Sequence, residues 1–143
     1  MNTEKIVYKS GEKSFEGFLA QPEGDSNPCV LIAHTWAGRD AFVEDKAKLL
    51  TELGYAAFAI DMYGDGKIGE SNEENQSMMQ PLLDDREELA NRVLASLEAV
   101  TKIESIDANK IVIMGYCFGG LVAMDLARTG ADIKGAVSFH GFL

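Results

Sequence analysis

Residues 110–127 read KIVIMGYCFGGLVAMDLA, and this stretch predicts the fold of the whole chain. The β-branched run Ile111, Val112 and Ile113 predicts a buried strand, and apolar residues recur at helical spacing after Gly120. The string G-x-C-x-G lies between them, with Cys117 at its centre. Strand, sharp turn and helix in this order are typical of a nucleophile elbow, which presents a reactive side chain above a sheet.

The glycines of this string have a steric reason in such a turn. A nucleophile in a strained backbone conformation leaves no room for side chains two residues before and two residues after it, where Gly115 and Gly119 stand. The N–H group of Phe118, at the helix start, would point at the oxygen of a bound acyl group. The alternative is a glycine-rich corner around a buried cysteine, since free cysteines are often core residues. We expect Cys117 to be a nucleophile.

Composition and charge narrow the possible classes of protein. The chain has 143 residues, a net charge of −10 and 46% hydrophobic residues, which suits one domain over residues 1–143. No basic stripe is available to neutralise phosphates, so nucleic acid and membrane surfaces are not expected partners. The N-terminus lacks the apolar core of a signal peptide. Cys29 and Cys117 lack metal-ligand spacing, so we expect reduced thiols in the cytoplasm, and neither a metal nor a cofactor.

Strands and helices are predicted to alternate along most of the chain. Residues 5–9 and 15–20 indicate an antiparallel hairpin, and apolar runs at 29–33 and 55–60 predict strands buried on both faces. A short strand over 134–140 follows the helix after the elbow. This order predicts an α/β fold, a mostly parallel sheet with helices on both faces.

The stretch between the strand at 55–60 and the elbow strand contains a loop and a helix. Residues 67–80 are polar and aperiodic, which predicts a long loop of the kind that often forms a lid. Residues 81–101 carry apolar residues on one stripe and predict a single helix.

Polar residues follow several predicted strands at their carboxyl ends, where open α/β sheets bind ligands. His34, Asp61, Cys117 and His140 all take such positions. Asp61 is expected to anchor the turn at residues 63–64 rather than to act as an acid. A cation site built on Asp61 and its acidic neighbours is not expected, because their spacing fits no calcium loop.

These residues resemble the dienelactone hydrolase family, a cytosolic branch of the α/β-hydrolases that uses a cysteine nucleophile. The matching pieces are residues 115–120 (GYCFGG), 54–57 (GYAA), 61–64 (DMYG) and the strand 31–33 that leads into the next loop. Their order and spacing agree, and the resemblance covers essentially the whole chain. It implies an α/β-hydrolase fold and hydrolysis of a small ester or lactone through an acyl-enzyme.

The resemblance also assigns residues to a site. Cys117 is the implied nucleophile, and the N–H groups of Phe118 and Trp36 are the implied oxyanion hole. His34, Thr35, Tyr116 and His140 are candidate pocket residues. For His34 the favoured alternative is a structural hydrogen bond to a neighbouring strand end, and His140 would serve as a base only in an unusual arrangement.

Three departures from the family pattern stand out. Thr35 takes the place of a glutamate that pairs with the cysteine in the type members. Residues 67–80 contain no arginine for a substrate carboxylate, and Arg86 is a weak match. The family's triad Asp and His follow the strand that ends this chain, so the sequence resembles the N-terminal part of a family member, truncated after that strand.

Two hypotheses therefore stay open. The first is a hydrolase whose triad is completed by residues outside this chain. The second is a truncated or degenerate hydrolase-fold module that binds a ligand or a partner without turnover. In either case the last strand would be an exposed sheet edge, so we expect a second polypeptide or a swapped homo-oligomer to cover it.

Overall fold

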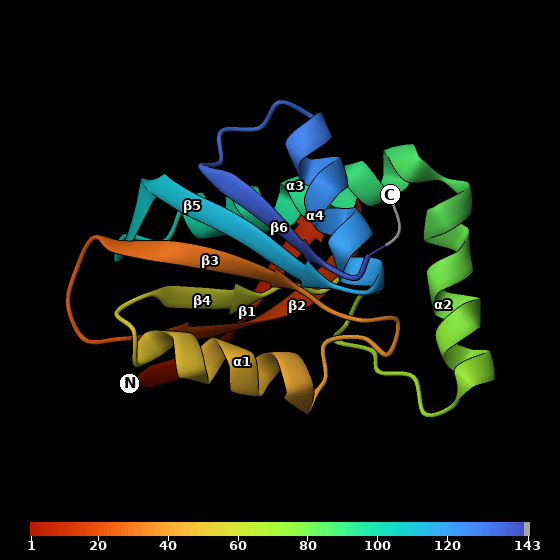
Figure 1. Cartoon of the computed structure of the whole chain (residues 1–143), viewed down its shortest axis with the longest axis horizontal. Helices are drawn as coiled ribbons and strands as arrows, with labels where there is room; N and C mark the ends of the chain where they lie inside the picture. The colour runs from red at the N-terminus through yellow and green to blue at the C-terminus, as the bar shows by residue number, and fades with distance from the viewer. Residues whose placement is uncertain (142–143) are drawn as a thin grey trace.

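Within residues 1–141, the part of the chain that the computed structural model describes, the strands form one six-stranded sheet (Figure 1). The predicted domain ran to residue 143, and residues 142 and 143 lie outside the described part. The strands are β1 (Asn2–Ser10), β2 (Lys13–Gln21), β3 (Asn27–Ala33), β4 (Ala56–Ala59), β5 (Ile106–Tyr116) and β6 (Gly135–Phe139).

The sheet has the order β1-β2-β4-β3-β5-β6. β1 and β2 form the antiparallel hairpin, and β2 also pairs antiparallel with β4. The pairs β4–β3, β3–β5 and β5–β6 are all parallel. The prediction of a mostly parallel sheet that begins with an antiparallel hairpin is therefore confirmed.

The helices are α1 (Ala41–Thr51), α2 (Asn72–Asp84), α3 (Arg86–Thr101) and α4 (Phe118–Arg128). Helix α1 covers one face of the sheet, and α3 and α4 cover the other, so that each face has its own apolar cluster (Figure 1). Helix α2 stands beyond the carboxyl ends of the parallel strands. No helix of the described residues has both the length and the apolar character needed to cross a membrane.

The predicted loop over residues 67–80 is wrong for most of its length, because α2 begins at Asn72. Ser71 caps this helix by accepting a hydrogen bond from the Glu74 N–H at 3.1 Å, and Glu73 and Glu74 complement the helix dipole in its first turn. The predicted single helix 81–101 is also wrong, since Asp85 separates α2 from α3. A largely solvent-exposed helix buries too few apolar residues to show a hydrophobic period.

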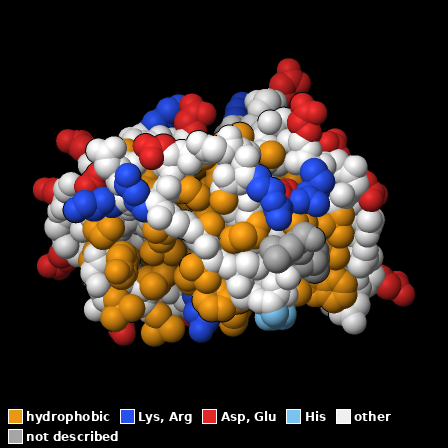
Figure 2. Space-filling model, turned by 45° about the horizontal axis from the view of Figure 1, so that its top comes forward, with side chains coloured by type: hydrophobic (Ala, Val, Ile, Leu, Met, Phe, Trp, Pro, Cys, Tyr) orange, Lys and Arg blue, Asp and Glu red, His pale blue; other side chains and the backbone are white. Residues whose placement is uncertain are grey.

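One part of the sheet carries exposed apolar side chains. On the α1 face, α1 packs mainly over β4 and β2, with fewer contacts to β3. Val137 and Phe139 of β6 are 50% and 42% exposed, and they pair in register with Met114 and Tyr116 of β5. Figure 2 shows one face of the molecule, on which hydrophobic side chains are most dense at the lower left.

Candidate functional site

Cys117 is the single residue between β5 and α4, and its backbone is strained. Its φ of 60° and ψ of −117° are unusual for a residue with a side chain, at a cost of about 1–3 kcal/mol. Hydrogen bonds on both sides hold this conformation: the Cys117 N–H donates to the Phe139 carbonyl at 3.0 Å, and the Gly120 N–H donates to the Cys117 carbonyl at 2.9 Å. Strand β6 and the first turn of α4 therefore maintain the strain together.

The two flanking glycines leave no space for a side chain. A Cβ atom at Gly115 would lie 1.8 Å from the Gly119 carbonyl oxygen. A Cβ atom at Gly119 would lie 2.2 Å from the Ala33 carbonyl oxygen and 2.6 Å from that of His34. Because these neighbours are backbone atoms, no rotamer change can relieve the clash. The first turn of α4 thus packs directly against the end of β3.

The loop after β3 carries the second predicted oxyanion-hole donor, the Trp36 N–H. Within residues 1–141, neither this N–H nor that of Phe118 meets a hydrogen-bond acceptor. Both groups belong to segments that the close contact of Gly119 with β3 brings together. The described part of the chain therefore uses neither donor, and the catalytic role of the two N–H groups stays a prediction.

His34 is fully buried and uses both of its ring nitrogens. Its Nδ1 lies 2.6 Å from the Thr35 carbonyl oxygen, and its Nε2 accepts a hydrogen bond from the Met62 N–H at 3.0 Å. Burial lowers the pKa of this imidazole, which favours the neutral form. The predicted hydrogen bond to a neighbouring strand end is confirmed, and it leaves no free nitrogen to act as a base for Cys117.

The other candidate pocket residues take three different positions. Thr35 accepts a hydrogen bond from the Ala37 N–H at 3.2 Å through its hydroxyl, which stabilises the turn. The Tyr116 ring stacks on Phe139 with ring centroids 4.9 Å apart and meets the Phe42 ring edge-on, on the α1 face of the sheet. His140 directly follows β6 and is exposed, with a φ of 37°. The role of these three residues in a pocket stays a prediction.

The Asp61 turn forms as predicted. Its carboxylate accepts hydrogen bonds from the N–H groups of Glu16, Tyr63, Gly64 and Gly66, at 2.9 to 3.0 Å. A carboxylate with this many donors is occupied structurally and is not free to hold a cation.

The sequence did not point to the role of Tyr63. Its hydroxyl donates a hydrogen bond to the Trp36 carbonyl at 2.8 Å, and its ring lies 4.9 Å from the His34 ring and 6.0 Å from the Phe118 ring. Tyr63 thus connects the Asp61 turn to the loop after β3. A tyrosine in a turn carries no sequence signal for such a contact, which depends on the neighbouring strands.

Arg86, the weak match to the family's substrate-binding arginine, is paired with a carboxylate. Its Nε and one terminal nitrogen each donate to Asp125 at 2.6 Å, and Arg128 donates to the same carboxylate. Burial raises the pKa of Asp125, but the hydrogen bonds from Arg86 and Arg128 outweigh burial and lower it overall. Arg86 therefore ties α3 to α4.

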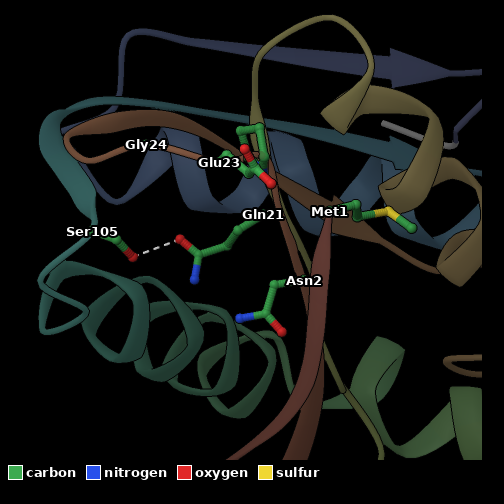
Figure 3. A pocket seen from close by; sticks show the side chains of 7 residues that line it. Met1, Asn2, Gln21, Glu23, Gly24 and Ser105 are labelled. Atoms are coloured by element: carbon green, nitrogen blue, oxygen red, sulfur yellow. Dashed lines mark hydrogen bonds between the residues drawn. The ribbon is translucent and has the colours of Figure 1, made fainter.

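A cavity of about 410 Å³ lies at the other end of the sheet (Figure 3). It is lined by Met1, Asn2, Gln21, Pro22, Glu23, Gly24 and Ser105, and Ser105 donates a hydrogen bond to Gln21 across it. Gln21 ends the antiparallel strand β2, and Ser105 precedes β5. The cavity therefore lies near the amino ends of the parallel strands, away from Cys117.

Comparison with known sequences identifies the family. The sequence model of the dienelactone hydrolase family matches residues 15–143. This chain belongs to the dienelactone hydrolase family. The match includes the strained Cys117 and the loop after β3, so the resemblance inferred from residues 115–120 is confirmed, as is the α/β-hydrolase fold.

Three relatives illustrate the similarity. A putative carboxymethylenebutenolidase of Aquifex aeolicus is 28% identical over 138 residues, which cover 93% of this chain and 58% of the relative. A probable 2-oxo-3-(5-oxofuran-2-ylidene)propanoate lactonase of Bradyrhizobium sp is 30% identical over 128 residues, 88% of this chain and 51% of that protein. The crystal structure of a dienelactone hydrolase-like promiscuous phosphotriesterase from metagenomic libraries has a TM-score of 0.94 at 33% identity, and the match covers 99% of this chain and 60% of that one.

The chain spans between half and three fifths of the length of these members of the dienelactone hydrolase family. The matched part contains the strand, turn and helix around Cys117 and the loop that follows β3.

Proposed function

We propose that this chain carries the nucleophile and the oxyanion hole of a hydrolase that cleaves a small ester or lactone through a cysteine acyl-enzyme. The observation that carries the proposal is the strained backbone of Cys117, which hydrogen bonds and two obligatory glycines maintain at the carboxyl end of β5. Such strain is costly and clusters at functional sites. A buried core cysteine, such as Cys29, needs no strained conformation.

In this proposal the Cys117 sulfur attacks the carbonyl carbon of the substrate. The carbonyl oxygen becomes an oxyanion and accepts hydrogen bonds from the Phe118 and Trp36 N–H groups. The oxyanion collapses, the C–O bond to the leaving alcohol breaks, and the alcohol takes up a proton. Water then attacks the thioester, which releases the acid and regenerates the thiol. Residues outside this chain supply the Asp and His that move these protons.

The substrate class follows from the family and from the named relatives. A lactone or a small ester has the carbonyl that this arrangement can activate, and one relative is named as a lactonase. Arg86 does not support selection of a substrate carboxylate, because Asp125 occupies its guanidinium group. We therefore propose a broader range of small esters rather than dienelactone alone.

The second candidate function is binding of a ligand or a partner without turnover. The observation that favours it is the environment of Cys117 within residues 1–141: His34 is engaged on both ring nitrogens, and Thr35 stands where the type members have a glutamate. The exposed side chains of Val137 and Phe139 on β6 support a proteinaceous partner, either a second polypeptide or another copy of this chain.

The reaction of the chain with p-nitrophenyl acetate tests the proposal. We expect a burst of p-nitrophenolate that approaches one equivalent per chain, and intact-mass and peptide analysis should place one acetyl group on Cys117. Cys29 provides the matched control, because it is 1% exposed and burial raises the pKa of its thiol to about 12.

The variants Cys117→Ala and Cys29→Ala distinguish the outcomes. Cys117→Ala should abolish the burst, and Cys29→Ala should retain it. Because p-nitrophenolate leaves without taking up a proton, attack by a Cys117 thiolate at alkaline pH needs neither the Asp nor the His. No burst under these conditions, or acetylation of Cys29 in preference to Cys117, would favour binding without turnover and reject the hydrolase proposal.

A further inference from the structure

We infer that His34 is a positioning residue that sets the direction of the Trp36 N–H by holding the carbonyl group of the same peptide unit. The inference rests on the proposed function, because in that function the Trp36 N–H donates a hydrogen bond to the carbonyl oxygen of the substrate. It assigns a task to a buried histidine that takes no part in proton transfer at Cys117.

The geometry of a single peptide unit carries the inference. The Thr35 carbonyl and the Trp36 N–H belong to the same peptide bond, which is trans. In a planar trans peptide the C=O and N–H bonds point in opposite directions. The Thr35 carbonyl oxygen faces the buried His34 ring, with 2.6 Å between it and Nδ1. The Trp36 N–H therefore points away from that ring and away from the interior beneath the loop.

The two partners of His34 determine its tautomer. A carbonyl oxygen can only accept a hydrogen bond, so the proton must be on Nδ1, which faces Thr35. A backbone N–H can only donate, so Nε2 must present its lone pair to Met62. The neutral ring thereby connects the loop after β3 to the segment after β4 and cannot rotate without losing both bonds.

Further contacts brace the peptide units around Trp36. The Gly38 N–H donates to the Thr35 carbonyl at 3.2 Å, and the Tyr63 hydroxyl donates to the Trp36 carbonyl at 2.8 Å. The Trp36 N–H itself meets no acceptor within residues 1–141. The loop is thus held through its carbonyl groups, while the donor needed for an oxyanion stays unoccupied. Such preorganisation costs no rearrangement when negative charge develops on the substrate.

Two substitutions separate the two bonds of His34. In His34→Asn the amide nitrogen takes the place of Nδ1, so donation to Thr35 is retained and the bond from Met62 is lost. In His34→Gln the amide oxygen takes the place of Nε2, so the bond from Met62 is retained and donation to Thr35 is lost. The two variants therefore change opposite ends of the same connection.

The experiment compares two reactions at Cys117 of the full chain. Acylation by p-nitrophenyl acetate forms an oxyanion, whereas alkylation by iodoacetamide displaces iodide and forms none. We expect His34→Gln to slow acylation by about tenfold or more, since loss of a whole oxyanion-hole donor costs about 10²–10³. Alkylation by iodoacetamide should change less than twofold in the same variant, and His34→Asn should stay within about threefold of the unmodified chain in both reactions.

The outcomes distinguish this inference from the proposed function. If the unmodified chain shows no acylation burst at Cys117, the proposed function fails and the inference fails with it. If the burst is present and His34→Gln acylates at the unmodified rate, only the inference is overturned. A parallel loss of acylation and alkylation in His34→Gln would also overturn it, because that pattern indicates general disruption of the fold around Cys117. Loss of acylation alone supports it.

Discussion

Replacement of Gly115 by alanine should destabilise this protein severely, although it adds only one methyl group. The new Cβ atom would lie 1.8 Å from the carbonyl oxygen and 2.2 Å from the carbonyl carbon of Gly119, and 2.8 Å from the Gly120 nitrogen. These are backbone atoms at the start of α4, so the helix and β5 must separate by more than an ångström to accommodate it. That separation would also disturb the Cys117 hydrogen bonds to Phe139 and Gly120.

The expected cost follows from these contacts. Overpacking a core costs typically about 1–3 kcal/mol when side chains can shift, and here the neighbours are backbone, so we expect at least about 3 kcal/mol. This is a large share of the roughly 5–15 kcal/mol that stabilises a domain. It corresponds to a fall of about 10 °C in the melting temperature of a chain of this length.

Urea unfolding followed by circular dichroism measures the effect, with Gly135→Ala as the matched control. A Cβ atom at Gly135, also on the β5–β6 pair, would meet only a Val112 methyl group at 3.8 Å, an ordinary contact. Its free energy of unfolding should stay within about 0.5 kcal/mol of the unmodified chain. Equal unfolding midpoints for Gly115→Ala and Gly135→Ala would refute the reasoning. A Gly115→Ala protein that is as stable as the unmodified chain, and whose Cys117 is alkylated as fast, would refute it too.

Three further predictions concern residues outside the elbow. The free energy of unfolding should fall as the pH drops below 6.5, by at most about 1.4 kcal/mol per pH unit. The reason is that the unfolded chain protonates His34 in this range, whereas burial lowers the pKa of His34 in the folded chain and keeps it neutral. His34→Gln should flatten this slope in urea titrations between pH 5 and about 7. Arg86→Ala should lower the free energy of unfolding by only roughly 1 kcal/mol, because Arg86 is partly exposed and Asp125 keeps its ion pair with Arg128. The acylation rate of Cys117 should not change. A selective rise in the half-saturation concentration for anionic esters would instead indicate that Arg86 contacts the substrate. Val137→Lys should shift sedimentation velocity profiles toward monomer, because it removes apolar surface from the exposed strand β6. An unmodified chain that is already monodisperse and monomeric would contradict this expectation.

Much of the fold could be predicted from local sequence. The apolar runs around residues 29–33 and 111–113 have the pattern of strands buried on both faces, and burial of those strands requires helices on each side. The glycines around Cys117 indicated the strand, turn and helix that the structure shows. Helix α2 was missed because only Asn75, Met79 and Leu82 of it are buried, too few to produce a hydrophobic period.

The candidate site was predictable only in part, for a different physical reason. Cys117 and the Phe118 N–H lie within one continuous turn, so their relation depends on local geometry that the glycine spacing reveals. The partners of His34 come from separate segments: Thr35 is its neighbour in the chain, but Met62 is 28 residues away. Which of these its nitrogens meet depends on the pairing of β3 with β4.

The sequence by itself determined the class of fold, the position of Cys117 between a strand and a helix, and the need for glycine on either side of it, because each depends on short-range sterics and on burial period. Tertiary structure alone decided that Arg86 pairs with Asp125, that Tyr63 holds the Trp36 carbonyl and that His34 holds the Thr35 carbonyl. The bonds of Arg86 and Tyr63 join residues far apart in the chain, and His34 is held in place by its bond to Met62. Their formation depends on how the strands and helices pack, which no local pattern of residues encodes.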